Sequence, residues 1–141
     1  MQRRLFMPAA LKGGCFCGRV RYEATGVPFH LTNCHCSMCR RTTGAPFVTW
    51  FSVRRADFRV MAGAPTSFRS SSTGARSFCS SCGTQLTFAS DDYPDEIDVT
   101  TCSLDDPEIL PPHDHTRTSS RLRWILLADG LPEYPEARPD R

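Results

Sequence analysis

The sequence predicts a mostly β domain of small antiparallel sheets that is held together by a four-cysteine zinc site. Three observations support this fold class. Apolar and polar residues alternate over short stretches, which is the pattern of a half-buried strand. Glycine and proline residues separate these stretches at short intervals, as expected for strands joined by turns. Seven of the eight cysteines fall in tight groups, which is typical of metal ligands and not of disulfides spread along loops.

Length and composition indicate one globular domain without a membrane span. A chain of 141 residues is long enough to bury a core, and 40% hydrophobic with 23% charged residues is ordinary for such a domain. A net charge of +2 gives no reason to predict binding to nucleic acid or to a membrane surface. No apolar run approaches the roughly 20 residues of a membrane helix, and Pro8 interrupts the apolar patch that an export signal would need. We therefore expect a cytoplasmic protein whose cysteines are thiols or metal ligands.

The first half of the chain predicts three strands and one short helix. Val20, Tyr22 and Ala24 alternate with charged residues, and this period of two predicts a strand. Gly44 marks the end of one or two helical turns. The expected elements are strands over Arg19–Ala24, Phe29–Asn33 and Ala45–Val53, with the helix over Ser37–Thr43.

The second half continues the β pattern and ends in irregular chain. Further strands are expected over Phe58–Met61, over Thr66–Ser70, around Leu86 and Phe88, and over Ile97–Cys102. The connections are a polar turn at Ser70–Gly74, a rigid non-helical stretch at Ser103–Pro112 and a short apolar run around Trp124 within Arg117–Leu127. We expect a flexible N-terminus over residues 1–12, the zinc-binding domain over residues 13–132 and a mobile tail over residues 133–141.

Cys15, Cys17, Cys79 and Cys82 form two pairs that lie far apart in the sequence. Four thiolates in two pairs match the closed tetrahedral pattern of structural zinc, which would tie the two halves of the sheet together. The alternative is that either pair is a redox-active dithiol, as C-x-x-C can be. A redox motif is normally followed by a helix, whereas Gly83 and a strand-like run follow Cys82. We therefore favour structural zinc.

Cys34, Cys36 and Cys39 form a second group that has no obvious fourth ligand nearby in the sequence. A catalytic zinc characteristically has three protein ligands and one exchangeable position, and all-thiolate ligation favours zinc over magnesium or calcium. His35 alternates with the cysteines, so its side chain should point away from their metal. The alternative is a fourth ligand from elsewhere in the chain, and the candidates are Cys102, His30, His113 and His115.

Two arginines and two histidines have both a functional and a structural interpretation. Arg40 and Arg41 could orient an anionic substrate over the metal, or could be solvated helix residues. His113 and His115 are explained most simply as loop residues, although a histidine near a zinc site could shuttle protons.

The two tryptophans and the isolated cysteine favour structural interpretations. Trp50 and Trp124 are expected in the core more than as platforms for a substrate. Cys102 lies in an expected strand, where a lone buried cysteine is usually a small hydrophobic residue.

With these residues located, the chain resembles the glutathione-dependent formaldehyde-activating enzyme family, which also includes the centromere protein V-like proteins. The resemblance runs from about Gly13 to Pro132 and rests on motifs that occur in the same order. They are G-x-C-x-C-G at Gly13–Gly18, C-H-C-S-x-C-R-R at Cys34–Arg41, F-C-x-x-C-G at Phe78–Gly83, S-L-D-D-P at Ser103–Pro107, and His115 before Trp124 and Asp129–Pro132.

The resemblance implies a β-tent fold with two zinc ions per chain. The activity that names the family adds glutathione to formaldehyde to give S-hydroxymethylglutathione, and it is classed as a carbon–sulfur lyase. The resemblance assigns the structural ion to Cys15, Cys17, Cys79 and Cys82, and the active-site ion to Cys34, Cys36 and Cys39. Arg40 and His115 are the further candidate catalytic residues.

We therefore expect a zinc-dependent carbon–sulfur lyase that acts on an adduct of a small thiol such as glutathione. Zinc in the second cysteine group would accept the substrate thiol and lower its pKa, which makes a thiolate nucleophile near neutral pH. Three thiolates already neutralise the charge of the ion, so activation of a soft thiol suits the site better than activation of water. The alternative is a non-enzymatic module in which the second zinc shapes an interaction surface.

Overall fold

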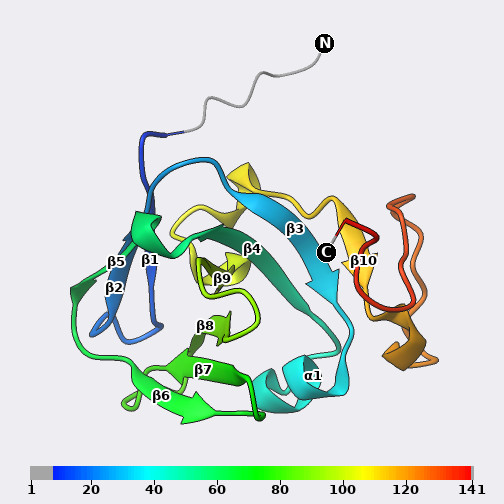
Figure 1. Cartoon of the computed structure of the whole chain (residues 1–141), viewed down its shortest axis with the longest axis horizontal. Coiled ribbons are helices and arrows are strands. Elements are labelled where there is room, and N and C mark those ends of the chain that lie inside the picture. The colour runs from blue at the N-terminus through cyan, green and yellow to red at the C-terminus, as the bar shows by residue number, and fades with distance from the viewer. Residues whose placement is uncertain (1–7, 141) are drawn as a thin grey trace.

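Two β-sheets form the framework of the molecule (Figure 1). The computed structural model describes residues 8–140, and its elements are mostly strands, as the sequence predicts. The smaller sheet has three antiparallel strands in the order β1-β2-β5. These strands are β1 (Leu11–Gly14), β2 (Arg21–Ala24) and β5 (Phe58–Ala62).

The larger sheet has seven strands in the order β10-β3-β4-β9-β8-β7-β6. All neighbours are antiparallel except β10 and β3, which are parallel. This one parallel pair departs from the purely antiparallel sheets that the sequence predicts. The strands are β3 (Phe29–Cys34), β4 (Val48–Arg54), β6 (Thr66–Arg69), β7 (Gly74–Phe78), β8 (Gln85–Ser90), β9 (Glu96–Thr100) and β10 (Asp114–Thr116).

The main apolar core contains side chains from both sheets. Tyr22 of β2 packs in one buried cluster with Phe51 of β4, Leu86 of β8 and Val99 of β9, and each is at most 2% exposed. The period of two predicted for β2 places Tyr22 and Ala24 on its buried face. The core therefore fixes the two sheets against each other, and it includes Cys15 and Cys79 of the first cysteine group.

The helix α1 (Ser37–Thr43) follows β3 directly and positions the second cysteine group. Cys36 is its N-cap residue, and the Sγ atom of Cys36 accepts a hydrogen bond from the backbone N–H of Cys39 at 3.3 Å. Gly44 ends the helix with a φ of 69°, a left-handed conformation that favours glycine. Among residues 8–140, no helix is long and apolar enough to cross a membrane. The predicted short helix, with its glycine stop, is confirmed.

The strand predicted over Ile97–Cys102 ends earlier than expected. β9 stops at Thr100, and Thr101–Ser103 forms a single 3₁₀ turn in which Cys102 is exposed. The Thr100 hydroxyl donates to Ser103 Oγ at 2.9 Å, and the Ser103 hydroxyl donates to the Thr100 carbonyl at 2.8 Å. Such local hydroxyl bonds compete with strand pairing. The expectation that Cys102 is a buried hydrophobic residue was wrong.

The two tryptophans have different environments. Trp50 of β4 is buried, as predicted, whereas Trp124 is 68% exposed and the prediction of a core position was wrong. The run around Trp124 forms a turn that is closed by a hydrogen bond from the Ile125 N–H to the Leu122 carbonyl. A turn of this kind directs successive apolar side chains to different sides, so it cannot bury all of them.

The C-terminal residues pack along β10. The N–H of His115 donates to the Pro132 carbonyl at 2.9 Å, and the N–H of Tyr134 donates to the His115 carbonyl at 2.8 Å. Arg138 forms a largely buried ion pair with Asp114. At the other end, residues 1–7 lie outside the described part of the chain, and Leu11 is buried in β1. The domain limits of 13–132 and the mobility of both ends stay predictions.

Candidate active site and metal centres

The first cysteine group brings together two segments that are distant in the sequence. The Sγ atoms of Cys15, Cys17, Cys79 and Cys82 all lie within 4.8 Å of one another, and none of these cysteines forms a disulfide. Cys15 and Cys17 are separated by 3.5 Å between sulfurs, and Cys17 and Cys79 by 3.8 Å. A tetrahedron with Zn–S bonds of about 2.3 Å has sulfurs about 3.8 Å apart. The four sulfurs therefore fit one tetrahedral metal ion such as zinc.

Tight turns hold each pair of this first group in place. The backbone N–H of Val20 donates to Cys15 Sγ at 3.2 Å, and the N–H of Gly83 donates to the Cys79 carbonyl at 2.8 Å. Gly83 has a φ of 80°, which closes the turn after Cys82. Hydrogen bonds from the side chain and then the backbone of Thr84 lower the pKa of Cys82 to about 5. This lowered pKa favours the thiolate of Cys82, which is the form that binds metals.

The second cysteine group lies where β3 passes into α1. Cys34 ends β3, Cys36 caps α1, and Cys39 lies on the first turn of α1, so their Sγ atoms all lie within 4.8 Å of one another. Cys39 is buried, whereas Cys34 and Cys36 are partly exposed. Among residues 8–140, no histidine, carboxylate or further cysteine joins this group. The alternative ligands weighed from the sequence therefore do not complete it.

The three sulfurs of the second group do not behave as independent thiols. Hydrogen bonds from Cys34 and Cys39 lower the pKa of Cys36 to about 2, while the hydrogen bonds with Cys36 and Cys39 raise the pKa of Cys34. Close sulfurs favour one thiolate at the expense of its neighbours, because adjacent negative charges repel. A divalent cation removes this conflict, since it allows all three to be thiolates at once.

A buried arginine lies against the second group. Arg76 of β7 is 4% exposed, and its two terminal nitrogens lie 3.8 and 3.7 Å from Cys39 Sγ. Its guanidinium stacks over the ring of Phe88, 4.9 Å from the centroid, and one nitrogen lies 3.5 Å from Thr42 Oγ1. None of the ion pairs among the described residues includes Arg76. The sulfur of Cys39 is therefore the group that faces its positive charge.

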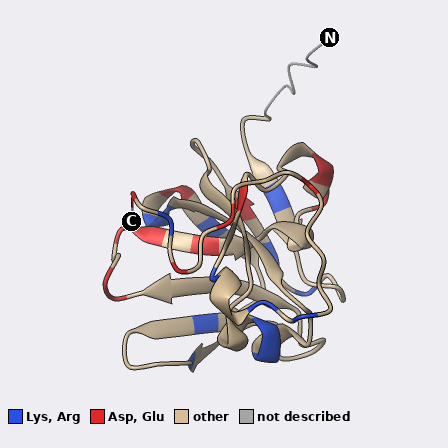
Figure 2. Cartoon of the chain, turned by 90° about the vertical axis from the view of Figure 1, so that its right-hand side faces the viewer, with Lys and Arg blue, Asp and Glu red and all other residues tan. Residues whose placement is uncertain are grey.

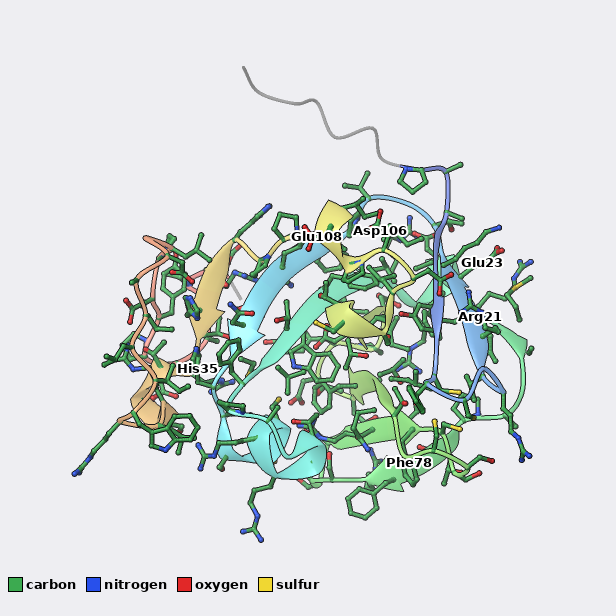
Figure 3. All side chains as sticks on the ribbon, turned by 180° about the vertical axis from the view of Figure 1, so that it is seen from behind. Arg21, Glu23, His35, Phe78, Asp106 and Glu108 are labelled. Atoms are coloured by element: carbon green, nitrogen blue, oxygen red, sulfur yellow. The ribbon has the colours of Figure 1, made fainter. Side chains whose placement is uncertain are left out.

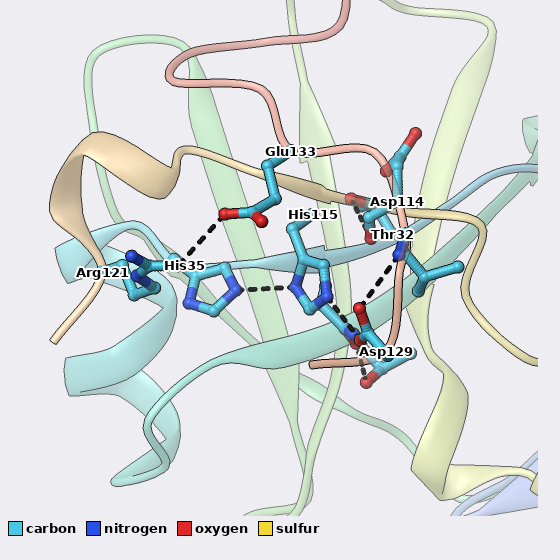
Figure 4. A network of polar contacts seen from close by, with 10 residues as sticks. Thr32, His35, Asp114, His115, Arg121, Asp129 and Glu133 are labelled. Carbon is cyan, nitrogen blue, oxygen red and sulfur yellow. Dashed lines mark hydrogen bonds and ion pairs between the residues drawn. The ribbon is translucent and has the colours of Figure 1, made fainter. Parts of the chain in front are cut away.

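Two buried histidines and Asp129 form a chain of hydrogen bonds (Figure 4). His35 Nε2 lies 2.9 Å from His115 Nδ1, and His115 Nε2 lies 2.7 Å from Asp129 Oδ2. Both rings are at most 1% exposed, and the ring of His35 also packs on Phe47 at 4.9 Å between centroids. Burial, and then the nearby His115, lowers the pKa of His35. Figure 3 shows His35 at the end of β3, beside β10.

These contacts change the interpretation of His115. The sequence suggests a loop residue, but His115 lies on β10 and is buried, so that expectation was wrong. β10 pairs with β3 in parallel and sets His115 opposite Asn33. This register brings His115 of β10 close to His35, which lies in the connection between β3 and α1.

A family model named for the glutathione-dependent formaldehyde-activating enzyme matches residues 10–120, which is most of the chain and includes both cysteine groups. The chain belongs to this family. A curated relative from Halomonas elongata, provisionally named a glutathione-dependent formaldehyde-activating enzyme, is 29% identical over 126 residues, which is 83% of this chain and 80% of the relative. An uncharacterized lyase from Schizosaccharomyces pombe is 31% identical over 78 residues, which is 55% of this chain and 56% of that protein.

Comparison with a solved structure supports the fold described above for this chain. The crystal structure of a Rhodobacter sphaeroides protein, a structural genomics target, superposes with a TM-score of 0.59 at 25% identity. The match covers 88% of this chain and 99% of that one. The two-sheet arrangement is therefore shared with an experimentally determined structure.

The remaining candidates from the sequence differ in their exposure and in their hydrogen-bond partners. Arg40 is partly buried on α1 and donates from Nη1 to the Ser120 carbonyl at 2.9 Å, whereas Arg41 is exposed. His113 is exposed and binds β3 through its backbone N–H. Figure 2 shows that basic residues predominate around α1, at the lower edge of that view.

Sequence reasoning did not identify Arg76 or Asp129 as residues of the site. Asp129 falls in the segment that carries the family resemblance, so it could have been proposed as a partner of His115. Arg76 has no such signal, because it stands in a short strand among small residues. Its burial against Cys39 is visible only in the fold.

Proposed function

We propose that this chain is a zinc-dependent carbon–sulfur lyase that acts on a thiol adduct, and that it forms S-hydroxymethylglutathione from glutathione and formaldehyde. In this proposal, the first cysteine group holds a structural zinc and the second holds the zinc of the active site. Family membership supports an enzyme of this kind, and the name of the Schizosaccharomyces pombe relative supports a lyase.

The observation that carries the proposal is the arrangement of the second cysteine group. Cys34 and Cys36 are partly exposed, and no fourth ligand among residues 8–140 joins the three sulfurs, which supports a metal site that is open to a small molecule. When bound, the metal supplies a further coordination position in which a substrate thiol is favoured as a thiolate. Three cysteine thiolates make the site a weak Lewis acid, which suits a soft sulfur ligand better than water.

The proposed reaction balances without an oxidant or reductant. The sulfur of glutathione forms a bond to the carbonyl carbon of formaldehyde, and the C=O double bond becomes a C–O single bond. The thiol loses its proton and the new hydroxyl group gains one. The chain's contribution is to bind the thiol, to favour its deprotonated form and to orient it toward the aldehyde.

Residues around the second group would support these steps. Arg40 is the proposed anchor for a substrate carboxylate, because it directly follows Cys39 and the residue is only partly buried. His115 is the proposed support for His35, which stands between Cys34 and Cys36 in the chain. The hydrogen bond between the two rings restrains the segment that carries these two cysteines.

The test is the rate of exchange between free glutathione and S-hydroxymethylglutathione, measured by exchange NMR with isotopically labelled formaldehyde. The zinc-loaded protein should accelerate the exchange above its spontaneous rate, and Cys36→Ser should abolish the acceleration. No acceleration with glutathione or with other small thiols would sink the proposal and would favour the non-enzymatic module.

A further inference from the structure

The guanidinium of Arg76 has an unusual position for an arginine. It is a buried cation, and it stacks on Phe88 with both terminal nitrogens directed at one sulfur. A buried charge is tolerated only when an opposite charge or strong hydrogen bonds compensate it. The structure offers Cys39 Sγ and the hydroxyl of Thr42 as the partners of its terminal nitrogens.

The charges of the second cysteine group explain why an arginine belongs there. Three thiolates and one divalent ion carry a net charge of about −1. Arg76 brings the total to about zero before any substrate arrives. A thiolate that approaches the group then meets a neutral environment, whereas without Arg76 it would meet a negative one.

The hydrogen bonds also act on the ligand itself. Two N–H groups directed at Cys39 Sγ withdraw electron density from this thiolate, which makes it a weaker donor. A metal ion with one weakened ligand accepts a further anionic ligand more readily. Charge balance and hydrogen bonding therefore act in the same direction.

We propose that Arg76 is the positioning residue that makes the three-cysteine centre selective for an anionic sulfur ligand over a neutral ligand. This inference rests on the proposed function. Arg76 acts through Cys39 and need not touch the substrate. The ligand class that it favours is a thiolate. A neutral donor such as imidazole gains nothing from its charge.

The experiment compares two ligands on the cobalt-substituted protein, whose visible absorption reports ligand binding without turnover. The dissociation constants of 2-mercaptoethanol and imidazole are measured for wild type, Arg76→Gln and Arg76→Lys. Arg69→Gln is the matched control, because it removes an exposed arginine from the neighbouring strand β6. Cobalt content and circular dichroism establish that each variant is folded and loaded.

Arg76→Gln should weaken thiol binding on the order of 10-fold and change imidazole binding far less. Arg76→Lys keeps the charge and should retain most of the preference, and Arg69→Gln should match wild type. If Arg76→Gln weakens the binding of 2-mercaptoethanol and imidazole equally, or leaves the ratio of their dissociation constants unchanged, the proposed role of Arg76 is overturned. If Arg76→Gln does not fold, Arg76→Lys decides, because selective loss of thiol binding despite the retained charge would contradict charge balance.

A second probe separates this inference from the proposed function. If wild type binds no thiol, the proposed thiol activation fails, and azide then replaces 2-mercaptoethanol as the anionic ligand. Arg76→Gln should still weaken azide relative to imidazole. An unchanged azide-to-imidazole ratio would overturn the inference independently of the enzyme's substrate.

Discussion

His35 Nε2 and His115 Nδ1 lie 2.9 Å apart between two rings that are almost fully buried. The carboxylate of Asp129 accepts a hydrogen bond from His115 Nε2, and this bond lowers the pKa of Asp129. The other ring nitrogen of His115, Nδ1, is the atom that shares a hydrogen bond with His35 Nε2. Asp129 therefore helps to orient both rings through His115. This chain links the C-terminal segment to the connection between Cys34 and Cys36.

Replacing His115 should destabilise the protein more than replacing its exposed neighbour. His115→Phe leaves Nε2 of His35 buried without its hydrogen-bond partner, which should cost about 1–3 kcal/mol in the free energy of unfolding. His113→Gln is the matched control, since His113 is exposed and should change stability by less than about 0.5 kcal/mol. Urea unfolding at saturating zinc measures both. Equal stabilities for the two variants would contradict a structural role for the pair.

Metal analysis should find two zinc ions per chain in protein that is loaded and desalted. Cys36→Ser removes one sulfur of the second group and should lower the content to one ion, because two thiolates bind zinc much less tightly than three. Arg76→Lys should keep both ions. One zinc per chain in wild type, unchanged by Cys36→Ser, would defeat the two-site proposal.

The two cysteine groups should respond differently to loss of a ligand. Structural zinc contributes about 10–16 kcal/mol in zinc-finger peptides, while a whole domain is stable by only about 5–15 kcal/mol. Cys79→Ser should therefore unfold the chain, as seen by circular dichroism. Cys36→Ser should remain folded and lose activity, because the partly exposed second group contributes less to the fold. The reverse result would exchange the assigned roles.

The strands and the cysteine groups could be predicted because their signals are short-range or chemically demanding. The alternation in β2 needs only the period of a strand to place Tyr22 on the buried face. Thiolate ligands must converge on one ion, so spacing alone paired Cys15 and Cys17 with Cys79 and Cys82 in the prediction. The structure brings these four sulfurs together.

The remaining features depend on contacts that no local pattern encodes. Arg76 is an ordinary arginine in sequence and acquires its environment from Cys39, which lies 37 positions away. β10 consists of three polar residues, a composition that predicts an exposed segment. It is nevertheless buried, in a parallel pair with β3. Cys102 was misplaced because the side chains of Thr100 and Ser103 end the strand through their own hydrogen bonds.

The ion pair between Arg138 and Asp114 should make the C-terminal segment part of the stable fold. Their side chains are only 11% and 9% exposed, and breaking a buried pair costs about 3–5 kcal/mol when one charge is left unpaired. Arg138→Met should approach this loss in urea unfolding. Arg117→Met breaks the exposed pair with Glu136 and should cost less than about 1 kcal/mol. If both variants matched wild type, the tail would be dispensable and the predicted boundary at residue 132 would hold.

The first glycine of the G-x-C-x-C-G motif should be required for packing and not for metal binding. A Cβ atom at Gly13 would lie 2.5 Å from the Ser103 carbonyl oxygen and 2.6 Å from Cζ of Tyr22, and it would also clash with Oη of Tyr22. Gly13→Ala must therefore displace backbone or a buried ring, which should cost about 1–3 kcal/mol of stability. Adding Tyr22→Phe should not restore the loss, because the ring and the carbonyl remain in place. The folded variant should still bind two zinc ions per chain, and a loss of zinc at unchanged stability would show instead that Gly13 serves the metal site.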